Sequence, residues 1–294
     1  MSETKLPVPT AESQLLVWLL DALKPMSRSK VKSLLQRGCV LVNGISITQH
    51  DHPLTLKDRI TICRERPVAS KHGLKQSGMA IVYEDDALIV VDKPSGLLSV
   101  ATESDKTETA FLHLSGEMEA RKIGRPFLVH RIDRGTSGLL IFARTESIRD
   151  TLKANWSKVE KTYLAVVEGT PRRAEGVVES YLVEGPDLRI RTYHVGHPDA
   201  KWAITQYRVL QTRGKFSLIE VKLGTGRKHQ IRVHMASLGC PVVGDKDYGA
   251  KTNPVKRLGL HSWRLALDHP VSGKRLELES PLPIALKRIV DGVG

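Results

Sequence analysis

A short stretch without apolar periodicity divides this chain and most constrains its fold. Residues 65–78, ERPVASKHGLKQSG, carry Pro, Gly, Ser and basic side chains instead of the regularly spaced apolar residues of a helix or strand. This composition is typical of a flexible linker. The 294 residues are enough for about two domains. We therefore expect a small domain over 12–64 and a larger one over 79–290.

The small domain is predicted to begin with two helices. ESQLLVWLLDALK (12–24) has leucines at helical spacing, and a proline follows directly. The second segment, SRSKVKSLLQRG (27–38), has its own apolar stripe and ends in glycine. Its Arg28 and Lys32 are four residues apart, so the two side chains share one face of the helix.

Two short strands are predicted after these helices. CVLVNGISI (39–47) has apolar runs on either side of Asn43-Gly44, a strong signal for a tight hairpin. The order of helix, basic helix, glycine and VLVNG resembles the S4 RNA-binding domain. This resemblance implies that Arg28 and Lys32 bind RNA.

The larger domain is predicted to be rich in strands, with helices at irregular intervals. AIVYEDDALIVVDK (80–93) predicts a hairpin, and FLVHRIDRGTSGLLIFAR (127–144) predicts strand, loop and strand. FSLIEVKLGTGRKHQIRVHMASLG (216–239) predicts strand, glycine turn and helix. This irregular order favours an α+β fold with a mixed, largely antiparallel sheet over a doubly wound parallel one. Exposed loops are expected at 185–201 and 244–259.

Charge and cysteine content narrow the class of protein. The chain has 45 Lys+Arg against 32 Asp+Glu, a formal charge of +13, which is typical of a protein with a polyanionic partner. Its three cysteines show no C-x-x-C spacing, so neither a disulfide framework nor a zinc site is indicated. The apolar run LLVWLL (15–20) is too short for a signal peptide or a membrane span. We expect a cytoplasmic protein that does not bind membranes.

The turn RIDRGTSG (131–138) is the strongest candidate for chemistry. Its Asp, Ser and Gly are ordinary turn residues, so composition alone is compatible with a purely structural turn. However, Asp133 lies between Arg131 and Arg134, and a carboxylate beside arginines is expected to be ionised at neutral pH. An ionised carboxylate suits a nucleophile or a base, and the arginines would attract a phosphate backbone.

Common cofactor motifs are missing from the sequence. There is no complete phosphate loop and no dinucleotide fingerprint, because GTGRKH (224–229) lacks the lysine-hydroxyl end that binds nucleotide phosphates. His229 and His234 lie about 140° apart around a helix of 3.6 residues per turn, which disfavours a metal pair. We therefore expect chemistry without a metal or nucleotide cofactor.

HRIDRGTSGLLIFAR (130–144) resembles the active-site signature of the RluA-type RNA pseudouridine synthases, H-R-[LI]-D-x-x-T-S-G. Three further stretches agree with this family in order and spacing, so the resemblance covers roughly residues 80–285. They are KTYLAVVEG (161–169), GTGRKHQIRVHMASLGCPVVGDKDYG (224–249) and LHSWRLALDHPVSGKRLELESPLP (260–283).

The resemblance implies roles for individual residues. Asp133 would be the catalytic aspartate, attacking the target uridine either at the sugar, as an ester, or by abstracting a proton. Tyr163 would pack on the base and assist proton removal from C5, and Arg227 would pair with the aspartate. Arg131 would fill the gap left by the extruded base. His130, Lys161 and Ile231 are expected to line the substrate site.

The implied function is isomerisation of specific uridines to pseudouridine. An S4-like companion favours large-subunit ribosomal RNA as the substrate, with transfer RNA as the alternative. A non-catalytic RNA-binding or ribosome-assembly protein on the same scaffold is the second alternative. The combination of Asp133, Tyr163 and Arg227 disfavours it. We expect RNA as the partner and a monomer.

Overall fold

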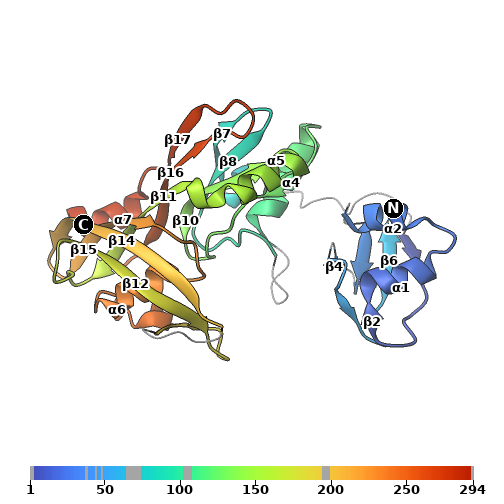
Figure 1. Ribbon diagram of the computed structural model, residues 1–294, viewed down its shortest axis with the longest axis horizontal. Coiled ribbons are helices and arrows are strands. Elements are labelled where there is room, and N and C mark those ends of the chain that lie inside the picture. The colour runs from blue at the N-terminus through green and yellow to red at the C-terminus, as the bar shows by residue number, and fades with distance from the viewer. Residues whose placement is uncertain are drawn as a thin grey trace. The chain divides into compact units, whose positions relative to one another are not determined.

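The chain folds into two compact units, residues Met1–Lys71 and His72–Gly294, in the computed structural model drawn in Figure 1. The structure describes residues 3–36, 39–43, 45–47, 49–63, 74–101, 108–193 and 199–292. Of the predicted linker, 65–73 lie outside the described residues, as do Gly38 and Gly44 of the predicted turns. The last part of the predicted linker forms α3 (Leu74–Ser77), a helical turn in which Leu74 is buried in one cluster with Met79. Residues 74–78 therefore belong to the second unit.

The first unit has the predicted two helices followed by short strands. Its sheet is antiparallel, in the order β1-β6-β3-β4, and β2 pairs with β5 separately. Leucines of both helices pack on the sheet in one apolar core, while Arg28 is exposed. The elements are β1 (Glu3–Lys5), β2 (Ser13–Gln14), α1 (Leu15–Ala22), α2 (Arg28–Gln36), β3 (Val40–Val42), β4 (Ile45–Ser46), β5 (Pro53–Leu54) and β6 (Ile60–Cys63).

The second unit is built on one 11-stranded sheet, in the order β13-β12-β14-β15-β11-β16-β10-β8-β7. β9 also pairs with β10, and β17 with β16. The strands are β7 (Ala80–Glu84), β8 (Leu88–Lys93), β9 (Phe127–Leu128), β10 (Ser137–Ala143), β11 (Glu160–Glu168), β12 (Glu175–Glu184), β13 (Ile190–Tyr193), β14 (Lys201–Arg213), β15 (Phe216–Leu223), β16 (Leu260–Asp268) and β17 (Arg275–Glu279).

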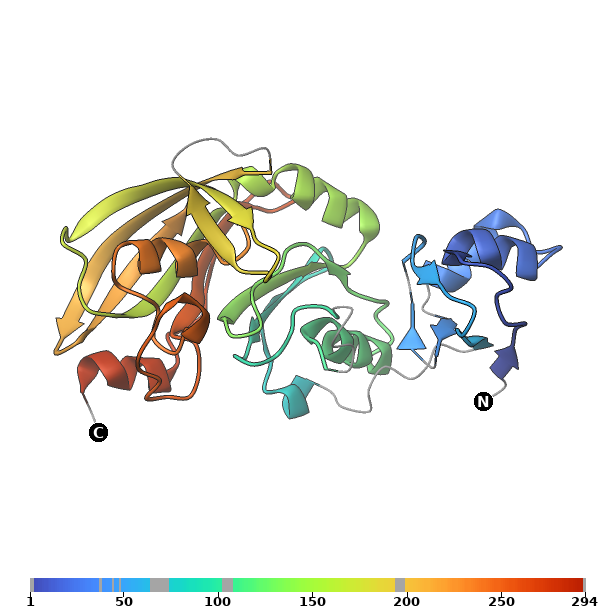
Figure 2. The same cartoon turned by 90° about the horizontal axis from the view of Figure 1, so that it is seen from below.

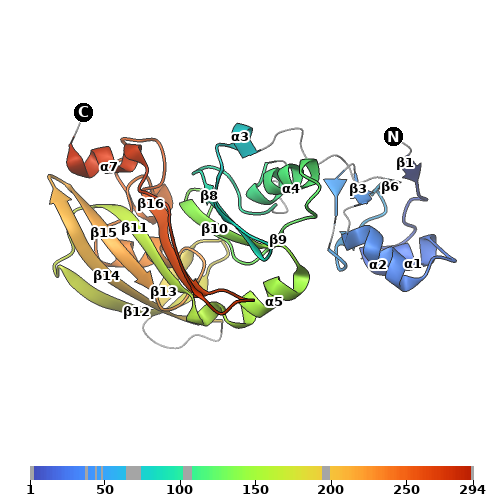
Figure 3. The same ribbon diagram turned by 90° about the horizontal axis from the view of Figure 1, so that it is seen from above.

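The predicted α+β class with a mixed, largely antiparallel sheet is confirmed. β10 and β16 pair in parallel through two residues, and the other described pairs of this sheet are antiparallel. Figure 3 shows β11 and β16 between β15 and β10, at the middle of the sheet. The helices are α4 (Ala110–Ala120), α5 (Glu146–Ala154), α6 (Gln230–Ser237) and α7 (Ile284–Asp291), with short 3-10 turns η1 (Trp156–Lys158) and η2 (Lys246–Tyr248).

Helices cover the two ends of this sheet separately. α4 and α5 lie beside β8 and β10 (Figure 1). Their apolar side chains form two clusters with the strands. α6 lies against β12, β14 and β15, as Figure 2 shows from another side. Within the described residues no helix combines the length and the apolar character needed to cross a membrane.

One predicted loop contains a strand. Residues 185–201 were expected to be an exposed loop, but Ile190–Tyr193 form β13, which pairs with β12 in register from Glu184 to Tyr181. The segment is too short and too basic to show a clear alternation, yet Ile190 is buried under α6 and fixes the strand. Residues 194–198 of this expected loop lie outside the described residues.

Candidate active site

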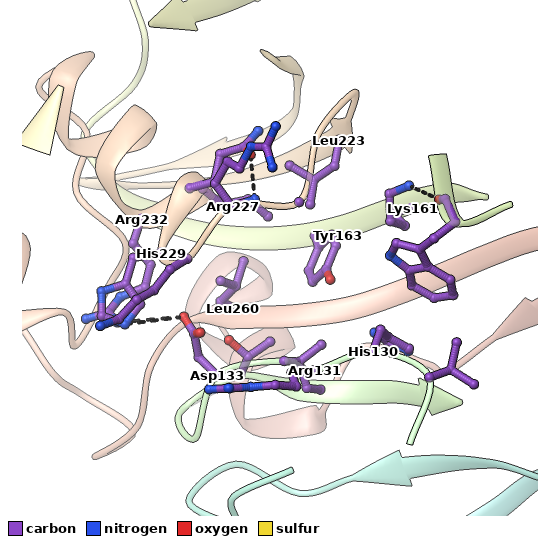
Figure 4. A pocket seen from close by; sticks show the side chains of 18 of the residues that line it. His130, Arg131, Asp133, Lys161, Tyr163, Leu223, Arg227, His229, Arg232 and Leu260 are labelled. Carbon is purple, nitrogen blue, oxygen red and sulfur yellow. Dashed lines mark hydrogen bonds and ion pairs between the residues drawn. The ribbon is translucent and has the colours of Figure 1, made fainter. Parts of the chain in front are cut away.

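Seven of the nine predicted site residues line one cavity of about 530 Å³ in the second unit (Figure 4). Its walls come from the loop between β9 and β10, from η1 and β11, and from the start of α6. Arg28 and Lys32 lie on α2 of the first unit. The seven residues are His130, Arg131, Asp133, Lys161, Tyr163, Arg227 and Ile231.

Asp133 begins a tight turn that a second loop holds in place. The Thr136 amide donates to the Asp133 carbonyl at 3.1 Å, which closes the turn. Residues 94–99, directly after β8, bind the same turn at several points. The Ser95 hydroxyl donates to Gly135 O at 2.6 Å, the Gly96 amide to Arg134 O at 2.8 Å, and the Ser99 hydroxyl to Ile132 O at 2.8 Å.

Lys93 supports this turn from inside the protein. Its side chain is fully buried, and its ammonium donates to the carbonyls of Pro94 at 2.9 Å, Leu97 at 2.7 Å and Arg134 at 3.3 Å. Burial lowers the pKa of Lys93 to about 7, opposed by the charge of Asp133. The lysine thus ties both loops together.

Gly138 allows the Asp133 turn to lie beside the strand that carries Tyr163. Gly138 of β10 pairs with Ser262 of β16, and Ser262 pairs with Tyr163 of β11. A β-carbon on Gly138 would lie 2.2 Å from Ser262 O, and its φ of +106° disfavours other residues. A bulge in the pairing of β11 with β16 falls at Tyr163, as bulges often do beside active sites.

Arg232 is the arginine that contacts Asp133, which corrects the prediction for Arg227. Arg232 Nη1 lies 3.7 Å from Asp133 Oδ2, whereas Arg227 Nε donates to the carbonyl of Trp202 at 3.1 Å. Figure 4 shows Arg227 apart from Asp133. The reason is the start of α6 at Gln230, because Arg227 precedes the helix and Arg232 lies in its first turn.

Three acidic groups and one ring surround the Arg232 guanidinium. Asp245 accepts from Nε at 2.6 Å and from Nη2 at 2.7 Å, and Asp247 accepts from Nη2 at 2.9 Å. The guanidinium also lies over the Tyr248 ring, 4.9 Å from its centre. Burial alone would lower the pKa of Arg232, but Asp245, Asp133 and Asp247 together raise it. Arg232 is therefore a fixed cation whose position depends on Asp245.

His229 adds a second nitrogen beside Asp133. Its Nε2 lies 4.0 Å from Asp133 Oδ2, and its Nδ1 is hydrogen-bonded to the Tyr248 hydroxyl at 2.8 Å. His229 adopts the left-handed conformation, with φ of +54°, immediately before α6. Its ring faces the turn that begins at Asp133. Burial lowers the pKa of His229, and the charge of Asp133 acts in the opposite direction.

The other end of the cavity is aromatic. His130 stacks on Trp156 with ring centres 4.5 Å apart, and His130 Nε2 accepts from the Ile141 amide. Burial, followed by the charge of Lys161, lowers the pKa of His130 to about 3, so this ring is neutral at pH 7. Burial raises the pKa of Tyr163 to about 12, so its hydroxyl keeps its proton. The Lys161 ammonium donates to the carbonyls of Trp156 and Val159.

A cavity with a fixed carboxylate at one end and an aromatic wall suits a flipped base. The profile of one protein family, described as RNA pseudouridylate synthase, matches residues 87–237. The chain belongs to this family. The RluA-type resemblance is thereby confirmed, and the protein is an enzyme that isomerises uridine in RNA.

Relatives of this synthase match nearly its whole length. The Uncharacterized RNA pseudouridine synthase YlyB of Bacillus subtilis (strain 168) is 32% identical over 91% of this chain and 89% of its own. The Ribosomal large subunit pseudouridine synthase D of Zymomonas mobilis is 31% identical, covering 93% of each chain. The solved Human RNA Pseudouridylate Synthase Domain Containing 4 is similar in fold, with a TM-score of 0.60 and 24% identity over 70% of this chain and 91% of that one.

Several residues of the synthase site were missed from the sequence. Arg232 and His229 stand in the quoted stretch 224–249, but nothing in their spacing shows which side chain faces Asp133. Trp156 begins η1, just after α5, and carries no sequence motif. Lys93 contacts the turn from 41 residues away in sequence, so only the folded chain reveals it.

His234 has a structural role inside the second unit. It is fully buried, and its two ring nitrogens lie 3.0 Å from the Ser180 hydroxyl and 2.8 Å from the Thr205 hydroxyl. Burial lowers its pKa to about 4. In the described part of the chain, no group of three or more His, Cys, Asp and Glu is arranged to hold a metal ion.

Proposed function

We propose that this synthase isomerises uridines of large-subunit ribosomal RNA, with Asp133 as the attacking group and without a cofactor. The single observation that carries the proposal is the Asp133 carboxylate, which lines the cavity 3.7 Å from Arg232. The relative from Zymomonas mobilis is named for the large ribosomal subunit, which supports the choice of RNA.

The reaction needs a base that has left its stack. An enzyme reaches a nucleobase only after the nucleotide flips out of the RNA, at a cost of a few kcal/mol. The open cavity accepts such a base between the Asp133 end and the ring of Tyr163. Leu223, Ile231 and Leu260 supply apolar walls.

The chemistry balances without an oxidant or reductant. The bond from C1′ of the ribose to N1 of uracil breaks, the base rotates, and a bond from C1′ to C5 forms. C5 then loses its proton, and N1 carries one in the product. Asp133 starts this sequence either as a nucleophile at the sugar or as a base that abstracts a proton.

The surrounding groups fit distinct roles. Arg232 and His229 orient the Asp133 carboxylate from one side. Tyr163 remains protonated in the cavity, so it is suited to packing on the uracil base and not to acting as a phenolate base. Arg131 is exposed at the cavity, where it is free to enter the space left in the RNA. Arg28 and Lys32 of the first unit would contact RNA phosphates.

Release of tritium from RNA labelled at uridine C5 tests the proposal directly. Ribosomal RNA and transfer RNA, both transcribed without modifications, are offered separately to the native protein and to Asp133→Asn. Asp268→Asn serves as the control, because this carboxylate is 70% exposed on β16 and does not line the cavity. We expect release from ribosomal RNA with the native and control proteins only.

Other outcomes select the alternatives. Release from transfer RNA alone would overturn the choice of ribosomal RNA but keep the chemistry. Release by Asp133→Asn at the native rate would overturn the role of Asp133. Tight binding without release from either RNA would favour a non-catalytic RNA-binding protein.

A further inference from the structure

Arg257 is half-buried and forms no ion pair with a carboxylate of the described residues. Its Nη2 donates to the Ser137 hydroxyl at 2.6 Å and its Nε to Leu258 O at 3.2 Å, which leaves Nη1 without a hydrogen bond to the described residues. Burial lowers the pKa of Arg257, and Asp92 is the acidic charge that opposes this effect. A guanidinium taken out of water in this way is stabilised by an anion.

The cavity that Arg257 lines is strongly basic. It has a volume of about 660 Å³, and Arg134, Gly135 and Ser137, which follow Asp133, line it. Four cations line it, Lys93, Arg134, Lys256 and Arg257, against the single carboxylate of Asp92. Lys93 is fully buried and, among the described residues, forms no ion pair with a carboxylate.

This basic cavity continues into the active site. A third cavity, of about 590 Å³, shares Arg134, Lys256 and Arg257 with the basic cavity. The same third cavity shares Arg131, Asp133 and Arg232 with the active site. Seven Lys and Arg residues line the third cavity against three Asp residues, so a strand of RNA leaving the active site would meet Arg257 along a mainly basic path.

We propose that Arg257 and Lys256 form a phosphate site for the RNA strand that flanks the target uridine. A backbone phosphate would accept hydrogen bonds from Arg257 Nη1 and from the exposed Lys256 ammonium. This site rests on the proposed action on RNA. It also couples phosphate binding to the catalytic turn, because Arg257 is bonded to Ser137, four residues after Asp133.

The salt dependence of RNA binding tests this site. The full chain carrying Asp133→Asn is the parent, so that binding is measured without turnover. Its affinity for a single-stranded RNA containing the target uridine is measured at several salt concentrations. Each phosphate contact contributes about −0.7 to the slope of log affinity against log salt on single strands. We expect Arg257→Gln and Lys256→Gln each to make the slope shallower by about that amount.

Two further variants separate phosphate binding from a structural role. Arg257→Lys keeps the charge but loses the fixed geometry toward Ser137, so we expect the parent slope to be largely retained. Lys274→Gln, in the exposed turn between β16 and β17, should leave the slope unchanged. An unchanged slope in Lys256→Gln and Arg257→Gln would overturn the proposal, as would equal losses in Arg257→Lys and Arg257→Gln.

Inorganic phosphate distinguishes the source of the anion. If phosphate raises the melting temperature of the parent but not of Arg257→Gln, while the RNA slope is unaffected, the site binds free phosphate and the RNA assignment is overturned. Tritium release by the native protein is a separate measurement. The proposed function and this phosphate site can therefore fail independently.

Discussion

Arg232 Nη1 lies 3.7 Å from Asp133 Oδ2, and the same guanidinium is bound through two hydrogen bonds to Asp245. The Asp133 carboxylate thus faces a cation that cannot move without breaking the buried ion pair of Arg232 with Asp245. Arg232→Lys keeps a positive charge but cannot bind Asp245 and Asp247 while facing Asp133. We expect single-turnover tritium release to fall by about 10²-fold, with RNA affinity little changed. Loss of affinity without loss of rate would contradict this assignment.

Asp245 should matter more than Asp247, although both contact Arg232. The Asp245 side chain is 1% exposed, whereas that of Asp247 is 53% exposed. Removing one partner of a buried ion pair costs about 3–5 kcal/mol, while exposed pairs contribute about 1 kcal/mol or less. We therefore expect Asp245→Asn to reduce both the free energy of unfolding in urea and the turnover rate. Asp247→Asn is the matched control, and an equal effect of the two changes would refute the argument.

Gly138→Ala should disrupt the parallel pairing that brings the Asp133 turn beside Tyr163. The added methyl group would lie 2.2 Å from Ser262 O, a backbone atom that cannot turn away. We expect destabilisation of more than about 4 kcal/mol, or failure to fold, in urea unfolding. Gly226→Ala provides the comparison, because a β-carbon there meets nothing within 4 Å. Native-like stability of Gly138→Ala would show that the strands can separate without cost.

Burial of His234 should make the stability of the protein depend on acidic pH. The pKa of this ring is lowered from 6.5 to about 4. Between these two pH values His234 binds a proton in the unfolded chain but not in the folded protein. The free energy of unfolding therefore decreases as the pH is lowered from about 6.5 to 4. At 1.36 kcal/mol per pKa unit, this group accounts for roughly 3 kcal/mol.

Replacement of the ring isolates this contribution. His234→Gln removes the titration, so its urea midpoint should fall less steeply between pH 6.5 and 4 than that of the native protein. His130, with a pKa of about 3, supplies a similar effect in both proteins and leaves a residual slope. The same steepness in both proteins would show that His234 does not titrate as its burial implies.

Local sequence determined much of this protein. Apolar runs and the turn signals at Asp133-Arg134-Gly135 depend on neighbours in the chain. The strands β7 to β10, the turn and the RluA-type signature were therefore predictable, whereas β13 was not. The same holds for the helices of the first unit, whose leucine spacing marks them directly. The composition of residues 65–78 predicted a linker, and that boundary stays a prediction.

Only the tertiary structure decided which charged groups meet. Arg227 and Arg232 are five residues apart in the sequence. Because α6 begins at Gln230, Arg232 lies in the first turn of the helix and contacts Asp133, whereas Arg227 does not. Lys93 reaches the turn across 41 residues, and Gly138, Ser262 and Tyr163 become neighbours only through strand pairing. Sequence patterns report the periodicity of single elements. The register between elements is set by packing and by close backbone approach, which no local pattern records.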